Sequence, residues 1–222
     1  MSAERKRLRQ DERGAVLIEF TAVVLTFFTV LFGVIEFSHA YYQWNAATKA
    51  VQLGARLAAV SEPVPTGFRD IDGLSGTILP GDPMPPFDFI CTANAPGCDN
   101  NALRLIVFGR CDTGETCSTA TINGSTVQVR TECNAASTAR NIGMCNLFRR
   151  IDNINQVEVQ YENTGLGYAG HPGGPVPTIT VRLRNLDFPF ILLSAFLPVN
   201  AIPLPSFATT VTGEDLNNSW GS

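Results

Sequence analysis

Six cysteines are the residues best able to form covalent links in this 222-residue chain. They are Cys91, Cys98, Cys111, Cys117, Cys133 and Cys145. An even set of cysteines confined to one part of a chain is typical of disulfide bonds formed in an oxidising compartment. The pairing is open at this stage, and sequential pairing would staple three short loops. A zinc site is the alternative, but there is no Cys-x-x-Cys pair and the only histidines are His39 and His171. We therefore expect no metal and no cofactor.

Two further motifs resemble catalytic or nucleotide-binding signatures. The glycines of Gly165-x-Gly167-x-x-Gly170 match a dinucleotide fingerprint, but a Pro- and Gly-rich stretch follows where that site needs a helix. Asp112-Thr113-Gly114 matches the triplet of aspartic proteases, whose chemistry needs two such aspartates, and no second copy exists. A flexible loop and a turn inside a disulfide loop are the better interpretations. We expect no catalytic residues and no enzyme activity.

Glu19 is the one charged residue in an apolar run from Ala15 to Ile35. A helix of that length rises about 31 Å, and the hydrocarbon core of a bilayer is about 30 Å thick. Only a helix can cross this core as a single segment with its backbone groups satisfied. A carboxylate inside such a span is costly and marks a candidate functional site. The sequence therefore predicts one membrane-spanning helix with a functional Glu19.

The flanks of the apolar run predict its orientation. Five basic residues precede it within residues 1–14, which places the N-terminus in the cytoplasm and the bulk of the chain outside. Tyr41, Tyr42 and Trp44 follow the run, where amphipathic aromatic side chains suit a membrane interface. Three other interpretations stay open: a secretory signal cleaved after Ala40, a plain signal-anchor and a buried core helix.

A cut after Gly14 would give Glu19 a specific role. It would create an ammonium group at Ala15 and make Glu19 the fifth residue of the mature chain. A carboxylate at that depth can pair with the amino terminus of a neighbouring helix, because two opposite charges are tolerated in lipid far better together than alone. Such a pair would fix the register in which related helices pack.

The basic tail, Gly14 at the cut, and the Glu19-Phe20 pair resemble the processing site of type IV prepilins, in particular the Flp (type IVb) branch. The run from Gly14 to Val23, together with the chain length, is similar to TadE, a minor pilin or pseudopilin of the tight-adherence (Tad) system. Val181-Arg182-Leu183 and Phe207-Ala208-Thr209-Thr210 also resemble the far end of TadE-like proteins.

The resemblance implies a role in pilus assembly, with cleavage between Gly14 and Ala15. The implied partners are a prepilin peptidase, other pilins or pseudopilins contacted through the helix, the inner-membrane Tad assembly platform and the lipid bilayer. The implied location is the inner membrane, as a single-pass protein that either stays there or enters the pilus. A formal net charge of −4 argues against nucleic-acid binding. The alternative is an uncleaved, membrane-anchored binding module.

The remaining pattern predicts an α+β fold. We expect a basic leader at residues 1–14, one helix over 15–61 that ends before Pro63, and an exported domain over 62–222. Residues 62–100 are predicted to be irregular loop and Leu103–Phe108 a strand. Asn123-Gly124-Ser125 is predicted to turn a hairpin, residues 156–161 and 178–183 to form strands, and the helix to pack on an antiparallel sheet. The apolar stretch 186–207 is predicted to pack in the core or to form an exposed patch.

Overall fold

The computed structural model describes residues 2–111, 117–122, 124–133, 141–171, 175–190, 201–203 and 207–213, with only the backbone described at 2–13, 188–189 and 201–203. It divides into two compact units. The first comprises Met1–Tyr42 and Asp187–Ile202, and the second Gln43–Leu186 and Pro203–Ser222. The predicted α+β class is confirmed, with one long N-terminal helix followed by antiparallel sheets.

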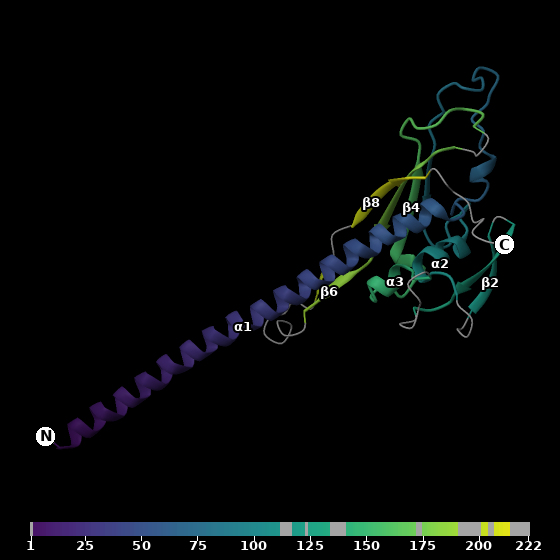
Figure 1. Cartoon of the computed structure of the whole chain (residues 1–222). Coiled ribbons are helices and arrows are strands. Elements are labelled where there is room, and N and C mark those ends of the chain that lie inside the picture. The colour runs from purple at the N-terminus through teal and green to yellow at the C-terminus, as the bar shows by residue number, and fades with distance from the viewer. Residues whose placement is uncertain are drawn as a thin grey trace. The chain divides into compact units, whose positions relative to one another are not determined.

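Helix α1 runs from Ser2 to Val60 as one continuous element (Figure 1). It ends where predicted, ahead of Pro63, but it begins well before the predicted start at residue 15. The physical reason is composition. The leader is built largely of Ala, Leu, Arg, Lys, Gln and Glu, which favour helix, and it contains no proline. The single Gly14 weakens the helix without ending it.

A four-stranded antiparallel sheet forms the centre of the second unit, in the order β1-β4-β5-β8. The strands are β1 (Asp88–Cys91), β4 (Val157–Glu162), β5 (Thr178–Leu183) and β8 (Ala208–Thr212). β4 and β5 match the two predicted strands, and their register places Val159 opposite Val181. Strands β6 (Asp187–Pro189) and β7 (Ala201–Pro203) pair separately. Most of the predicted apolar stretch 186–207 lies outside the described residues, although Leu186 and Phe207 are buried.

The C-terminal part of α1 packs on this sheet through small side chains. Ala47, Ala50, Ala55 and Ala58 are buried and belong to the same apolar cluster as the inward-facing residues of β4 and β5. Small residues let a helix backbone approach its neighbour closely. At Gly54 even a Cβ atom would lie 2.5 Å from Met144 Sδ, so this position cannot accept a larger side chain without movement. Helix α1 and the sheet thus contribute to one apolar cluster.

Helix α2 (Asn100–Phe108) corrects one prediction, because Leu103–Phe108 was expected to be a strand. A short apolar run does not by itself distinguish a strand from a buried helix. The flanking residues decide here. The Asp99 carboxylate accepts a hydrogen bond from the Asn101 N–H at 2.7 Å and caps the helix, while Gly109 (φ 84°) ends it. Helix α3 (Met144–Leu147) packs beside α2.

Strands β2 (Cys117–Ile122) and β3 (Ser125–Arg130) form the predicted hairpin. Their register places Ile122 opposite Ser125, so the turn lies between these two residues. Gly124 adopts φ 86°, a left-handed conformation that glycine adopts without strain. In contrast, β1 lies inside the stretch predicted to be irregular, as does a short 3-10 helix, η1 (Phe68–Asp70). A second 3-10 helix, η2 (Ile154–Gln156), precedes β4.

Tyr161 joins β4 to the chain that leaves α1. Its side chain is fully buried, and its hydroxyl oxygen accepts a hydrogen bond from the Val64 N–H at 3.3 Å. Its ring packs against Phe68, with ring centroids 5.5 Å apart, and Phe68 in turn contacts Phe87 and Phe89. Burial raises the pKa of the Tyr161 hydroxyl above its ordinary value, so this group stays neutral in the core.

We predict that Tyr161→Phe lowers the free energy of unfolding by about 1–2 kcal/mol, because the Val64 N–H would stay buried without an acceptor. Chemical denaturation of the detergent-solubilised protein, followed by fluorescence, measures this change. Tyr168→Phe is the matched control, since Tyr168 is exposed. Equal stability of wild type and Tyr161→Phe would show that the hydrogen bond contributes nothing.

Candidate functional site

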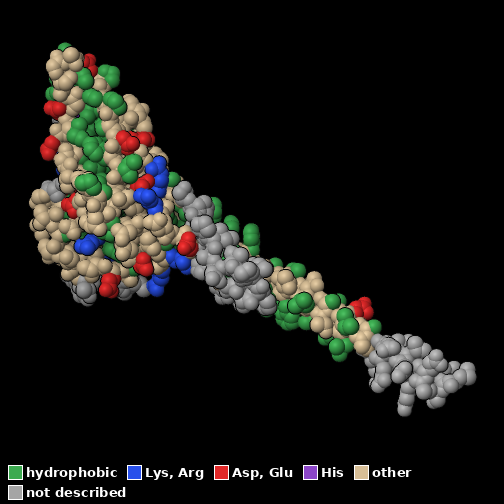
Figure 2. All heavy atoms as spheres, turned by 180° about the vertical axis from the view of Figure 1, so that it is seen from behind, with side chains coloured by type: hydrophobic (Ala, Val, Ile, Leu, Met, Phe, Trp, Pro, Cys, Tyr) green, Lys and Arg blue, Asp and Glu red, His purple; other side chains and the backbone are tan. Residues whose placement is uncertain are grey.

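The first half of α1 presents apolar side chains to its surroundings on every side. Val16, Leu17, Phe27 and Phe37 are each more than 60% exposed, although they lie at different angles around the helix axis. Figure 2 shows hydrophobic side chains along the visible face of this helix. The segment from Gly14 to Val60 contains a window of mean hydropathy 2.3 with none of its residues buried. A helix that is hydrophobic all round and uncovered is suited to a lipid environment.

The hydroxyl side chains of this segment are satisfied within the helix. Thr21, Thr26, Thr29 and Ser38 each donate a hydrogen bond to the carbonyl oxygen four residues earlier, at 2.7–2.9 Å. In hydrocarbon no water is present to accept these protons, and an unsatisfied hydroxyl is costly there. The polar residues of the predicted span, apart from Glu19, are therefore compatible with lipid.

The residues of the predicted processing site all lie on α1 and are exposed: Gly14, Ala15, Glu19 and Phe20. Ala15 and Glu19 stand four positions apart, which places them on the same face of the helix, one turn from each other. Beyond its chain neighbours and the helix's own nearby backbone, no described atom lies within 4 Å of the position that a Cβ at Gly14 would occupy.

A polar pair near the end of the span was missed by the sequence reasoning. Glu36 is only 4% exposed and Gln43 9% exposed. They are seven residues apart, close to two helical turns, and therefore lie on one side of α1. The seven-residue spacing of these two polar residues is the sequence signal that could have predicted a shared, buried face. The uniformly apolar surface of the helix thus ends near Glu36, one residue beyond the predicted span.

The six cysteines form three disulfides, and the described residues contain no free thiol. The pairs are Cys91–Cys98, Cys111–Cys117 and Cys133–Cys145, which is the sequential order. Each joins Cα atoms 5.7 or 5.8 Å apart, within the usual range for a disulfide. The Asp112-Thr113-Gly114 triplet lies outside the described residues.

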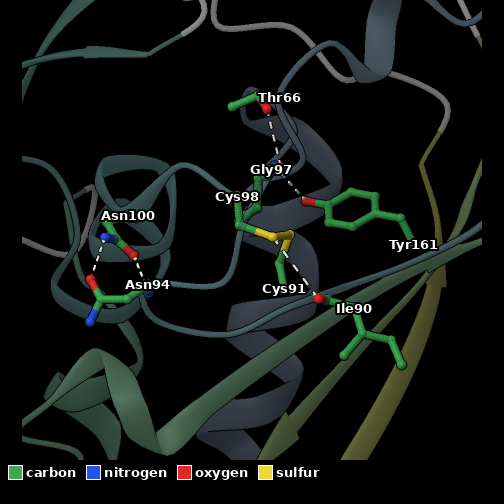
Figure 3. Close-up of a disulfide and its surroundings, with 9 residues drawn as sticks. Thr66, Ile90, Cys91, Asn94, Gly97, Cys98, Asn100 and Tyr161 are labelled. Atoms are coloured by element: carbon green, nitrogen blue, oxygen red, sulfur yellow. Dashed lines mark hydrogen bonds between the residues drawn. A yellow bond between two sulfur atoms is a disulfide. The ribbon is translucent and has the colours of Figure 1, made fainter.

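The first disulfide closes the loop that hydrogen-bonds to the chain directly after α1 (Figure 3). Inside this loop the Gly97 carbonyl accepts hydrogen bonds from the Thr66 N–H at 2.9 Å and from the Thr66 hydroxyl at 3.2 Å. The Asp99 N–H donates to the Val64 carbonyl at 2.8 Å. Because Val64 also donates to Tyr161, the disulfide loop and β4 clamp the chain directly after the helix.

The glycine-rich motif forms a loop, as predicted. Gly165, Gly167 and Gly170 all have φ between 77° and 92°, and the loop returns to the sheet at β5. A phosphate site of this type needs a helix N-terminus directly after the glycines. None is present in the described residues that follow Gly170 up to the start of β5.

The exposed apolar helix and the disulfide-linked α+β unit define a class: proteins anchored in a membrane by a helix near the N-terminus and carrying a folded α+β domain. Residues 14–56 match the family model described as TadE-like protein. The predicted resemblance is confirmed, and this segment associates the chain with the Tad pilus system. The match ends within α1, before the sheet begins. No curated protein and no solved structure matches the chain.

We predict that Cys91→Ala/Cys98→Ala lowers the free energy of unfolding by about 2–3 kcal/mol, because the unfolded chain loses a short closed loop. The loss should exceed that of the Cys111→Ala/Cys117→Ala control, since only the first loop clamps the end of α1. Denaturation curves of both variants under non-reducing conditions test this order. A larger loss for the control pair would contradict the clamp.

Proposed function

We propose that the chain is a minor pilin, or pseudopilin, that takes part in assembly of a Tad pilus or secretion apparatus. The carrying observation is Glu19, an exposed carboxylate on an otherwise apolar helix, placed five residues after Gly14 inside the TadE-like segment. A lipid-facing carboxylate would be a costly defect without a partner. A pairing role accounts for its position.

The proposed mechanism begins with hydrolysis of the Gly14–Ala15 peptide bond by a prepilin peptidase. Water adds across the bond, so the leader leaves with a carboxylate on Gly14 and Ala15 gains an amino group that is protonated at neutral pH. Glu19 of one helix then pairs with this ammonium on a neighbouring pilin. The attraction is strong in a low-dielectric medium, and it aligns the two helices along their axes.

The proposed arrangement places the basic leader in the cytoplasm and the disulfide-linked unit beyond the inner membrane. Five basic side chains precede the span, and all cysteines follow it. An oxidising compartment suits the three disulfides. The proposed partners are other pilins, met through α1, and the inner-membrane assembly platform. The role is structural, and we assign no catalytic step to the chain.

We predict that mass spectrometry of the membrane-extracted protein finds Ala15 as its first residue. The experiment needs the native host or a strain that expresses the prepilin peptidase, with a peptidase-deficient strain as control. A chain that still begins at Met1 or Ser2 in both strains would reject processing and favour the uncleaved binding module. A start at Tyr41 would instead indicate signal peptidase.

We predict that Glu19→Gln leaves the exported unit folded and reduces co-isolation with partner pilins by at least about tenfold, because the amide carries no charge to pair with the ammonium. Glu19→Asp, which keeps the charge, should retain part of the interaction. Non-reducing peptide mapping of the three disulfides controls for folding. Unchanged co-isolation of Glu19→Gln would remove the pairing role.

A further inference from the structure

Two loops of the second unit are held together at one end of the domain, seen at the top of Figure 1. The Gly81 N–H donates to the Ala169 carbonyl at 2.9 Å, and the Ala169 N–H donates back to the Asp82 carbonyl at 2.8 Å. The Gly170 N–H donates to the Asp72 carbonyl at 2.7 Å. These bonds fix the loop 72–82 against the loop 163–171. The surface that the two loops share is therefore held in one conformation by backbone hydrogen bonds.

This surface exposes large apolar side chains, which we call the apolar tip: Leu74, Leu79, Leu166 and Tyr168. Leu79 is 65% exposed and Tyr168 44% exposed. Figure 2 shows green side chains gathered at this end of the domain, with red ones beside them. A contiguous apolar patch rimmed by polar residues commonly marks a protein interaction site.

The rim of the apolar tip is acidic. No Lys or Arg occurs in residues 70–103 or 157–181, the segments that supply both loops. Asp70, Asp72 and Asp82 lie in or beside the first loop, and none makes an ion pair with a residue that the structure describes. The nearest preceding cation, Arg69, is paired with Glu62 at 3.0 Å. The complement of this surface is an apolar centre with basic neighbours.

The same chain carries such a complement on α2, on α3 and in the residues directly after α3. Residues 104–150 contain six arginines against three carboxylates. We define the arginine surface as the exposed Leu147 of α3 and the arginines of the two packed segments: Arg104, Arg149 and Arg150. None of these arginines makes an ion pair within the described residues, and one carboxylate, Asp152, follows them. In Figure 1, α2 and α3 lie away from the two loops.

We propose that the apolar tip of one copy docks on the arginine surface of a second copy, head to tail. The pairing joins apolar side chains at its centre and opposite charges at its edge, the arrangement that gives an interface its orientation. A copy displaced without rotation keeps its anchoring helix pointing the same way, as one membrane requires. Such a heterologous contact does not close on itself and extends a row of copies. It requires neither leader cleavage nor Glu19.

Cysteine cross-linking of the full chain in proteoliposomes tests the contact. All native cysteines are in disulfides, so an added thiol is unique. We expect a short bis-maleimide to join Leu79→Cys to Leu147→Cys when the two proteins are mixed, and to join neither variant to itself. Leu79→Cys mixed with Thr126→Cys, an exposed residue of β3, is the matched control. Cross-linking of Leu79→Cys alone would show a tip-to-tip contact and overturn the proposal. Equal cross-linking yields for Leu147→Cys and the Thr126→Cys control would also overturn it.

Charge exchange tests the orientation in the same assay. Arg149→Glu on the arginine surface, or Asp70→Arg at the tip, should each lower the cross-linking yield about tenfold, because like charges then meet. Combining Asp70→Arg in one partner with Arg149→Glu in the other should restore it. Arg56→Glu, the same charge change on α1, is the control and should have no effect.

Salt dependence gives a second test of the charged edge. Raising NaCl to 1 M should weaken the contact between copies that carry no charge exchange, since exposed charges are screened. Failure of the exchange to restore the yield would reject the proposed pairing.

Discussion

One helix has to satisfy two different apolar environments, and the rest of the structure depends on how it does so. Along residues 16–37 most of the large apolar side chains are exposed. From Ala47 to Ala58 the buried positions are mostly alanine. Large side chains fill lipid contacts in any direction, whereas small ones let a sheet approach the backbone. The change in side-chain size along one element therefore separates the anchor from the core.

The folded unit is assembled around the end of this helix. The chain leaving α1 must reverse direction while its backbone is buried, and each polar group there needs a partner. Val64 donates to Tyr161 on β4, and its carbonyl accepts from Asp99, the residue directly after the Cys91–Cys98 loop. Two elements distant in sequence thus meet at one residue. The Cys91–Cys98 disulfide therefore stabilises the fold mainly by holding the loop that binds the chain after α1, and less by closing its own short loop.

The sequence was sufficient for the elements whose signals are local and strong. The apolar span, the β2–β3 hairpin, and β4 and β5 all follow from periodicity and turn chemistry. The prediction of a strand at Leu103–Phe108 was wrong, because a short apolar run shows no periodicity that separates a strand from a helix. The helix cap at Asp99 outweighs the strand preference of the β-branched residues in this run. β1 was missed because four residues flanked by prolines give no alternation long enough to read. Its strand character comes from its pairing with β4, which only the fold supplies.

The two exposed apolar surfaces differ in their charged neighbours, and this difference separates their functions. The span follows a leader with five basic residues, which suits anionic headgroups. The apolar tip is bordered by carboxylates and has no basic residue in the segments that supply its two loops. An anionic membrane surface would repel it, so equal hydrophobicity leads to different partners. The net charge of −4 conceals this division, because the acidic segments and the arginine-rich stretch partly cancel in the sum. The positions of the charges, which the fold sets, carry the information that the total does not.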